Sequence, residues 1–488
     1  MISILSRQAR KACIFGFGLL LFFCQQAFAQ PALPESVSSA LKKAKISEND
    51  IAIVVADADS KGKVWLLHNE KTAMNPASVI KLVTTFAALD ILGPNYIWKT
   101  AIFADGELDN KGVLHGSLYI RGSGDPSMTA DRMRDLLLQV RASGITQIQG
   151  NVVIDRSAYQ IPEVNPGAFD GEPLRAYNVK PDALLINYKT VELIFNAALA
   201  QAGDQIPVLS NPPLTGVKIS PTVTVGSQKN CADWRANLKA DFNDTLNIRF
   251  DGSYPVSCGS KRWYVAYPDP LSYSLRVVGG LWEELGGSIK GRVTFGPVPA
   301  NAKLIAEGDS KTLGQIVYDI NKFSNNVMAQ SAFLALSLPD QKAILSARPL
   351  PGAASWEGSQ RAVQSWWAQR IAGQAAPVME NGSGLSRKES ISALSLAVMM
   401  QHAWQSAVMP EYLSSLPIAG VDGTMRRCKA EADAHIKTGS LNNVTARAGY
   451  VLGKNGKRRV LVFFVNSDKA AQAREAMDAL IDWAAQVQ

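Results

Sequence analysis

The chain has 488 residues, of which 47% are apolar and 19% charged, and a formal net charge of +8 at neutral pH. This size and composition allow a sizeable buried core and predict about three domains. The excess of cations is mild and forms no basic cluster, which excludes nucleic acid as a partner.

The N-terminus has the pattern of a secretory signal peptide. Three cations precede an apolar run from Ala12 to Cys24, and Ala27-Phe-Ala29 supplies small residues before a cleavage site. We therefore expect residues 1–29 to be removed and the mature chain to act in the periplasm. A lipid anchor at Cys24 is disfavoured because Phe23 occupies a position that lipid-attachment signals reserve for a small residue. Membrane contact would then be peripheral at most.

The first predicted elements of the mature chain lead to a serine and a lysine one helical turn apart. Residues 51–57 and 63–69 read as a strand pair, and a helix begins near Asn75. Ser78 and Lys81 share one face of this helix. A serine hydroxyl needs a neighbouring base, and the positive end of a helix disfavours a protonated lysine. The pair predicts Ser78 as a nucleophile and Lys81 as its base.

A long segment separates this helix from the next motif. Between positions 100 and 299 the sequence is rich in strand-like runs, such as 118–121, 149–154 and 221–225, punctuated by Gly, Pro, Asn and Asp. We expect one or two small β domains here. They would be inserted into a single domain made of residues 30–99 and 300–488.

Two further motifs follow the predicted insertion. Ser324-Asn-Asn326 is the single Ser-x-Asn sequence between Ser78 and Lys437, and Lys437-Thr-Gly439 is the single Lys-Thr-Gly sequence of the chain. Ser324 would relay a proton to a leaving amine, and Asn326 would hold a substrate amide. Each motif is weak alone, but the three in series predict an acyl transferase with an active-site serine.

The third motif lies in a strand-like stretch. Lys437 and Thr438 can hold a carboxylate by charge and hydroxyl, and Gly439 lets a substrate approach the backbone closely. The backbone N–H groups of Ser440 and Ser78 would form an oxyanion hole. After this stretch we expect a hairpin at 447–466 and a helix at 469–487, giving a mixed sheet flanked by helices in which the first and last elements are adjacent.

The order of these three motifs resembles that of penicillin-binding proteins and class A β-lactamases. The phrases 122–126, 381–387 and 419–424 are similar to stretches of the D-alanyl-D-alanine carboxypeptidase/endopeptidases of the low-molecular-mass class C penicillin-binding proteins, the penicillin-binding protein 4 type. The resemblance covers most of the mature chain. It implies an α/β transpeptidase/β-lactamase-like fold with two inserted domains between the first and second motifs.

The resemblance also implies a function. Ser78 would attack the carbonyl between two D-alanines of a peptidoglycan stem peptide, cross-links between stems would be cleaved by the same residues, and β-lactams would acylate Ser78 covalently. Arg387 would meet a substrate carboxylate, and Asp170 the charged end of a peptide side chain. No metal or organic cofactor is implied, and the oligomeric state is left open.

Two other functions are compatible with parts of this pattern. A β-lactamase would need fast deacylation, and the 246 positions between Ser78 and Ser324 argue against this compact class. A non-catalytic module that binds peptidoglycan or senses β-lactams is the second alternative, which the intact motif residues oppose.

Three cysteines remain after the predicted signal peptide, in a compartment that permits disulfides. Cys231 and Cys258 lie in the same inserted segment between polar turns, so we expect a disulfide between them. Cys428 stands apart and is expected to be a buried, inert thiol. The four histidines show no spacing typical of metal ligands.

Overall fold

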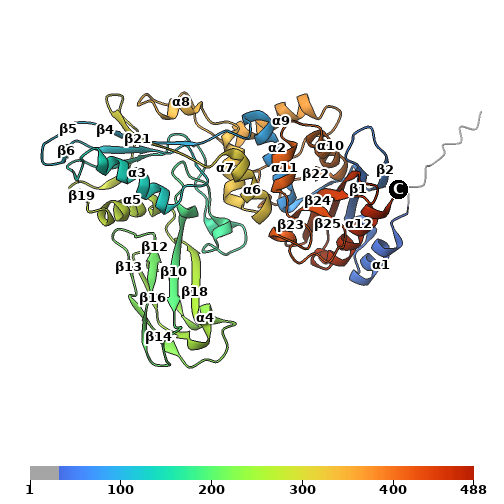
Figure 1. Ribbon diagram of the computed structural model, residues 1–488, viewed down its shortest axis with the longest axis horizontal. Helices are drawn as coiled ribbons and strands as arrows, with labels where there is room; N and C mark the ends of the chain where they lie inside the picture. Colours follow the sequence, from blue (N-terminus) through green and yellow to red (C-terminus); the bar gives the residue numbers. More distant parts are fainter. Residues whose placement is uncertain (1–31) are drawn as a thin grey trace, which may run out of the picture.

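The computed structural model describes residues 32–488, so the predicted signal peptide lies outside the described residues. Residues 32–98 and most of residues 310–488 build the core domain, and residues 99–309 build an inserted region that extends away from it (Figure 1). The two ends of the chain therefore share one domain, and the middle of the chain is inserted between them. The segment 341–354, which contains α8 (Gln341–Ile344), packs on the inserted region.

A five-stranded antiparallel sheet forms the centre of the core domain, with the strand order β2-β1-β25-β24-β23. The strands are β1 (Ile51–Asp57), β2 (Val64–His68), β23 (Ala434–Leu441), β24 (Val444–Leu452) and β25 (Arg458–Asn466). Because β1 pairs with β25, the N-terminal and C-terminal elements meet in the middle of the sheet. The α/β fold class predicted from the sequence is confirmed, but the core sheet is antiparallel throughout, not mixed as predicted.

Helices cover both faces of this sheet. Every residue of β1 is buried because its alternating side chains enter two different cores. Ile51, Ile53 and Val55 pack with the helices of one face, whereas Ala52 and Val54 pack with those of the other. The first face carries α1 (Glu35–Ala44) and α12 (Arg474–Gln486). The second core includes α2 (Lys81–Leu92), α6 (Leu313–Phe323), α7 (Asn326–Ala335), α9 (Trp356–Arg370), α10 (Ala393–Trp404) and α11 (Met409–Ser415).

The inserted region begins and ends in an α/β unit. Its larger sheet has the order β20-β9-β7-β4-β21, and its first and last strands in the chain, β4 (Lys99–Ala104) and β21 (Lys303–Asp309), pair side by side. The other strands are β7 (Leu118–Arg121), β9 (Val152–Asp155) and β20 (Val293–Phe295). Two helices that the sequence reading did not include, α3 (Ala130–Ala142) and α5 (Tyr273–Glu284), pack on this unit. The region also continues past position 299, because β21 completes the sheet.

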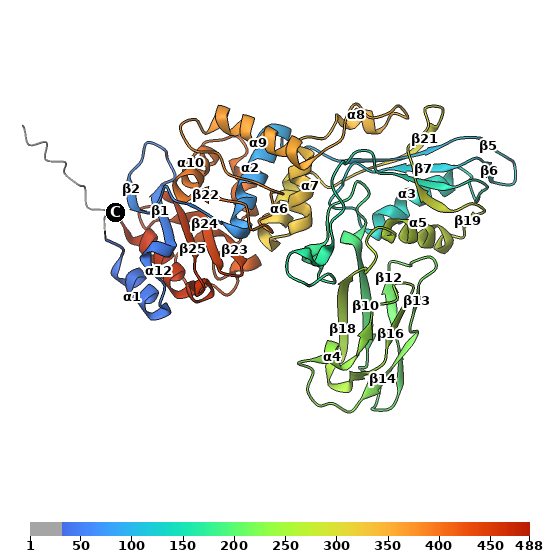
Figure 2. The same ribbon diagram turned by 180° about the vertical axis from the view of Figure 1, so that it is seen from behind.

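Residues 190–266 form a lobe that projects from this unit, as Figures 1 and 2 show from opposite sides. We call it the pendant lobe. It is built from short sheets, one of which has the order β12-β10-β18. These strands are β10 (Thr190–Asn196), β12 (Leu209–Asn211) and β18 (Ser260–Ala266). Phe195, Trp234 and Tyr254 form its aromatic centre. The predicted disulfide between Cys231 and Cys258 is present in this lobe.

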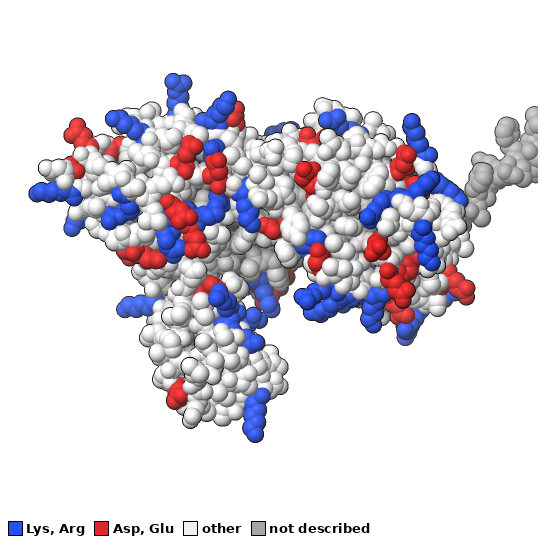
Figure 3. All heavy atoms as spheres, viewed as in Figure 1, with Lys and Arg blue, Asp and Glu red and all other residues white. Residues whose placement is uncertain are grey.

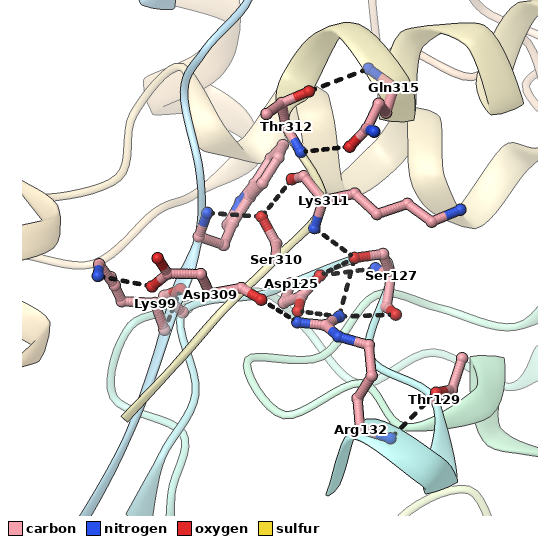
Figure 4. A network of polar contacts seen from close by, with 12 residues as sticks. Lys99, Asp125, Ser127, Thr129, Arg132, Asp309, Ser310, Lys311, Thr312 and Gln315 are labelled. Carbon is pink, nitrogen blue, oxygen red and sulfur yellow. Dashed lines mark hydrogen bonds and ion pairs between the residues drawn. The ribbon is translucent and has the colours of Figure 1, made fainter. Parts of the chain in front are cut away.

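A polar network braces the junction where the chain enters and leaves the inserted region (Figure 4). Lys99 forms an ion pair with Asp309 at 2.6 Å. Arg132 binds Asp125 at 2.7 Å and also contacts the carbonyl of Asp309. Asp125 in turn accepts the backbone N–H of Ser127, which is the turn-shaping role that its sequence context favours. These contacts hold the two connecting strands together.

The same network leads directly to helix α6. Lys311 donates its backbone N–H to Ser127 Oγ at 3.2 Å, and Thr312 and Gln315 then form a reciprocal cap at the start of α6 (Figure 4). The second sequence motif lies at the other end of this helix. The junction therefore fixes the position of Ser324 relative to the inserted region.

Candidate active site

Ser78 lies in a short 3₁₀ turn, Ala77–Ile80, immediately before α2. The prediction of one continuous helix from Asn75 was therefore not met at its first turn. Asn75 instead accepts the backbone N–H of Ala77 at 2.8 Å, and Ala77 has a φ of +45°. The resulting turn leaves the Ser78 side chain half-buried, so it remains accessible to a substrate.

Lys81 connects the first motif to the second. Its Nζ donates hydrogen bonds to Ser78 Oγ at 2.9 Å and to Asn326 Oδ1 at 2.8 Å, and it also contacts the carbonyl of Ser383. The side chain is fully buried because α2, which begins with this residue, is apolar and packed on nearly all sides.

Burial controls the protonation of the two lysines in the site. It lowers the pKa of Lys81 from 10.5 to about 7, although the negative charge of Glu389 acts in the opposite direction. Burial and the nearby Lys81 together hold the pKa of Lys437 well below its usual range. A substantial fraction of Lys81 is therefore neutral at pH 7 and can accept a proton.

The second motif forms a tight turn between α6 and α7. Ser324 ends α6 in the left-handed conformation, with a φ of 59°, and Asn325 caps α7 by accepting the backbone N–H of Met328 at 3.0 Å. The turn directs two side chains toward the other motifs. Asn326 reaches Lys81, and Ser324 Oγ accepts a hydrogen bond from Lys437 Nζ at 2.9 Å.

The third motif lies on β23, the edge strand of the core sheet. A side chain at Gly439 would place its Cβ only 2.5 Å from the carbonyl oxygen of Pro76 and 3.0 Å from the nitrogen of Ser78. Glycine is required there because the strand passes directly against the turn that carries the serine. This contact brings the backbone of Gly439 against the nitrogen of Ser78, and the oxyanion hole formed with Ser440 stays a prediction.

Sequence reasoning missed Glu389. Its carboxylate is buried, and Oε1 accepts the backbone N–H groups of residues 380–382 at 2.9–3.1 Å. These bonds hold the turn that presents the Ser383 carbonyl to Lys81. No pattern in the sequence could have distinguished Glu389 from a surface charge, since its burial depends on the packing of distant segments.

Thr424 was also missed, although the phrase 419–424 had been noted for its resemblance. Its hydroxyl accepts a hydrogen bond from the hydroxyl of Thr438 at 2.8 Å. The loop that carries it is held by the buried amine of Lys322, which binds Asp422 at 2.8 Å and the carbonyl of Leu416 at 2.7 Å. Thr424 therefore places a second hydroxyl group beside that of Thr438 on β23.

Arg387 and Asp170 lie on adjoining segments, and both already make protein contacts. Arg387 donates to the carbonyl of Asn442 at 3.0 Å, and its guanidinium lies 4.9 Å from the ring centre of Phe169. Asp170 accepts a hydrogen bond from the hydroxyl of Tyr177 at 2.9 Å. The structure thus brings the Asp170 segment next to Arg387, but in this state neither charged group is free of a protein partner.

The inserted region touches the site through Tyr177. The 3₁₀ turn Ala176–Asn178 packs on α7, and the carbonyl of Tyr177 accepts a hydrogen bond from Asn326 Nδ2 at 3.2 Å. Asn326 therefore joins Lys81 on one side to the inserted region on the other.

Cys428 lies outside this cluster. Its half-buried thiol donates to Asp478 Oδ1 at 3.0 Å, and burial raises the pKa of the thiol to about 11. The thiol is therefore protonated at neutral pH and unsuited to nucleophilic attack.

Two observations concern residues 32–488 as a whole. In that range no group of three or more His, Cys, Asp or Glu side chains is arranged to hold a metal ion. No helix of the same residues combines the length and apolar character needed to cross a bilayer.

The site contains the accessible hydroxyl of Ser78 and the buried, partly neutral amine of Lys81. It also contains the amine of Lys437, which is bonded to the hydroxyl of Ser324. The backbone of Gly439 on β23 lies against the nitrogen of Ser78. This set can activate a serine, stabilise an oxyanion and return a proton to a leaving group, which together are the requirements of acyl transfer.

Comparisons with known proteins agree with this chemistry. Residues 33–487 match the model of the D-Ala-D-Ala carboxypeptidase 3 (S13) family. The chain is 25% identical over 451 residues to D-alanyl-D-alanine carboxypeptidase of Actinomadura sp. (strain R39), covering 87% of this chain and 79% of that protein. It is 23% identical to D-alanyl-D-alanine carboxypeptidase DacB of Haemophilus influenzae, covering 91% of each.

A solved structure shows the same fold. The crystal structure of penicillin binding protein 4 (dacB) from Haemophilus influenzae has a TM-score of 0.72 with 22% identity, covering 92% of this chain and 99% of that one. A second structure of that protein, in complex with a β-lactam, has a TM-score of 0.67 with 23% identity, covering 93% and 100%.

Proposed function

Because the chain belongs to the D-Ala-D-Ala carboxypeptidase 3 (S13) family and is thus a serine-type DD-peptidase, we propose that Ser78 is its nucleophile. The substrate is a peptidoglycan stem peptide ending in D-alanyl-D-alanine. Ser78 attacks the carbonyl between the two D-alanines, and the C-terminal D-alanine leaves. The observation that carries this proposal is the contact of 2.9 Å between Lys81 Nζ and Ser78 Oγ.

Acylation requires a proton acceptor and an oxyanion site. Neutral Lys81 takes the proton of Ser78 as the new C–O bond forms. The backbone N–H groups of Ser78 and Ser440 stabilise the oxyanion, each worth roughly 3 kcal/mol in comparable sites. The amine of the departing D-alanine receives its proton through Ser324, which is bonded to Lys437.

Substrate recognition uses groups around the same cluster. Thr438 and Lys437 bind the terminal carboxylate, whose negative charge would raise the lowered pKa of Lys437 again and favour its protonated form. Gly439 allows the peptide to lie along β23. Asn326 holds an amide of the stem. Arg387 and the Asp170 segment bind the peptide further from the scissile bond, which requires both residues to exchange their present protein contacts for substrate.

Hydrolysis of the acyl-enzyme by water completes the carboxypeptidase reaction. The same nucleophile would cleave D-alanyl cross-links, because the scissile bond again follows a D-alanine carbonyl. A β-lactam places its strained carbonyl at the same position and would remain bound to Ser78. Since peptidoglycan lies outside the cytoplasmic membrane, we propose that the chain acts in the periplasm after loss of its signal peptide.

The experiment that tests this proposal is intact mass spectrometry of the mature chain after brief exposure to benzylpenicillin. We expect one adduct on the wild type that persists for hours, and none on Ser78→Ala. Release of D-alanine from a pentapeptide by the wild type would accompany it.

Other results would contradict the proposal. An adduct that disappears within seconds as the drug is consumed would identify a β-lactamase. A persistent adduct without release of D-alanine would identify a β-lactam sensor. An adduct on Ser78→Ala would remove Ser78 from the role of nucleophile.

A further inference from the structure

A cavity of about 550 Å³ lies where the pendant lobe meets the segment 172–177 of the inserted region. Four aromatic residues line it: Tyr177, Trp234, Trp263 and Tyr264. Tyr177 and Tyr264 are 44% and 58% exposed, which is unusual for rings of this size. Figure 3 shows a notch in the surface between the pendant lobe and the core domain, bordered by side chains of both charges. We refer to the cavity as the aromatic cleft.

The charges of the aromatic cleft are balanced. Arg175 and Arg235 line it together with Glu172 and Asp233. A polyanion would be attracted by a surplus of cations, which the cleft lacks. Exposed rings combined with hydrogen-bonding groups of both signs instead suit a neutral, polyhydroxylated ligand, whose C–H faces stack on rings while its hydroxyl and acetamido groups bond to the charged side chains.

The walls of the cleft are held in place by contacts among its own residues and with Phe242 outside it. Trp263 packs edge-on against Phe242 and Trp234, with ring centres 5.6 and 6.1 Å apart. Arg235 lies 5.0 Å from the ring centre of Trp234. Because these groups are already ordered, a ligand would lose little free energy in fixing them.

The cleft is connected to the candidate active site. Tyr177 lines the cleft, and its carbonyl accepts the hydrogen bond from Asn326, which in turn contacts Lys81 and through it Ser78. An extended peptide spans at most about 3.5 Å per residue, so four residues reach roughly 14 Å. A span of this size is comparable to the series of hydrogen bonds that leads from Ser78 through Lys81 and Asn326 to Tyr177, which lines the cleft.

We propose that the aromatic cleft binds the amino-sugar chain to which the stem peptide is attached, with Tyr264 as a stacking platform. This inference rests on the proposed function for its ligand, since a peptidoglycan stem is joined to a glycan by an amide that leaves the sugar neutral. The cleft makes the enzyme prefer stems on glycan over free peptides. An extended peptide lying against β18, an edge strand, is the competing occupant.

Binding to the Ser78→Ala variant of the mature chain tests the cleft without turnover. The probe is a peptide-free tetrasaccharide of alternating N-acetylglucosamine and N-acetylmuramic acid methylamide, titrated by calorimetry. Replacing Tyr264 by Ala should weaken binding roughly fivefold, because it removes one aromatic contact. Tyr264→Phe keeps the ring and should bind like the parent. Leu199→Ala, at a fully exposed position of the same lobe, serves as the distal control.

Absence of tetrasaccharide binding, or equal binding by Tyr264→Ala and its parent, overturns the proposal. If the free stem peptide binds, loses its binding in Tyr264→Ala, and the glycan does not bind, the cleft is a peptide site. That result also overturns the proposal.

Kinetics separate this inference from the proposed function. With Ser78 intact, kcat/KM for D-alanine release is compared between a disaccharide-pentapeptide and the same free pentapeptide. We expect the wild type to prefer the former and Tyr264→Ala to lose the preference, with acylation by benzylpenicillin unchanged. Release of D-alanine without any preference overturns the cleft alone. Glycan binding without release of D-alanine overturns the proposed function alone.

Discussion

Lys81 Nζ lies 2.9 Å from Ser78 Oγ, and burial lowers the pKa of this amine to about 7. The two facts have one origin, because α2 begins with Lys81 and buries it among apolar neighbours. A lysine with its ordinary pKa would remain protonated at pH 7 and could not remove a proton from the serine. The buried helix start therefore suits Lys81 to the role of base that we propose for it.

The first prediction concerns the pH dependence of acylation. The lowered pKa makes Lys81 neutral above about pH 7 and protonated below it. The rate of acylation by a fluorescent penicillin should therefore fall roughly tenfold per pH unit in the acid limb. Lys81→Arg, which stays protonated, should lose about 10²–10⁴-fold in rate at every pH. The exposed Lys388→Met is the control, and a flat profile between pH 5 and pH 8 would contradict the assignment of the base.

The second prediction concerns the charge of Glu389. Its anion raises the pKa of Lys81, so the neutral variant Glu389→Gln should lower that pKa and move the acid limb of the acylation profile to lower pH. Glu389→Ala should lower the rate at all pH values instead, because it also frees the turn at residues 380–382. Glu380→Gln, on the same turn but partly exposed, is the matched control and should leave the limb where it is.

Much of the core domain could be predicted because its local sequence pattern agrees with the secondary structure that it adopts. Residues 51–57 are a strand in both the prediction and the structure, and so are residues 458–466. Their pairing follows from the need to bury both faces of one sheet. The prediction that the first and last elements are adjacent needed only this argument and the position of the insertion.

The features of the structure that the sequence did not predict depend on contacts between segments far apart in the chain. Helices α3 and α5 were overlooked because the neighbouring strand-like runs dominated the reading of the inserted region. The left-handed conformation of Ser324 and the burial of Glu389 arise where separate segments pack together. The structure brings Ser78, Lys81, Ser324, Asn326 and Lys437 into one cluster, but the sequence did not indicate that Tyr177 would touch it.

The third prediction concerns the close contact at Gly439. Its replacement by Ala would place a methyl group 2.5 Å from the carbonyl of Pro76 and force β23 away from Ser78. We expect a loss of stability of about 1–3 kcal/mol, with slower acylation because the oxyanion donors separate. Thermal unfolding and the acylation rate check the two effects. Gly352→Ala, where a Cβ meets no atom within 4 Å, should change neither.

The fourth prediction concerns the hydroxyl pair of Thr424 and Thr438. Because Thr424 accepts the proton of the Thr438 hydroxyl, its own hydroxyl proton is free for the substrate carboxylate. Thr424→Val removes this donor and should raise KM for a D-alanyl-D-alanine peptide about three- to tenfold, with a smaller change in kcat. Thr222→Val, an exposed position of the pendant lobe, is the control. An unchanged KM would show that Thr424 plays no part in holding the carboxylate.

The last prediction separates the stability of the pendant lobe from the chemistry of the site. The disulfide joins Cys231 and Cys258 across 27 positions, and closing a loop of that size stabilises a fold by roughly 3–4 kcal/mol. The double Ser variant should therefore unfold its lobe at a lower temperature.

Both cysteines of that bridge lie outside the residues that contact Ser78 and Lys81, so penicillin acylation at room temperature should keep its rate. Cys428→Ser, which removes a thiol that forms no disulfide, is the control and should leave the lobe transition unchanged. If loss of the bridge slowed acylation while the lobe stayed folded, the lobe would be coupled to the site more tightly than the single contact through Tyr177 implies.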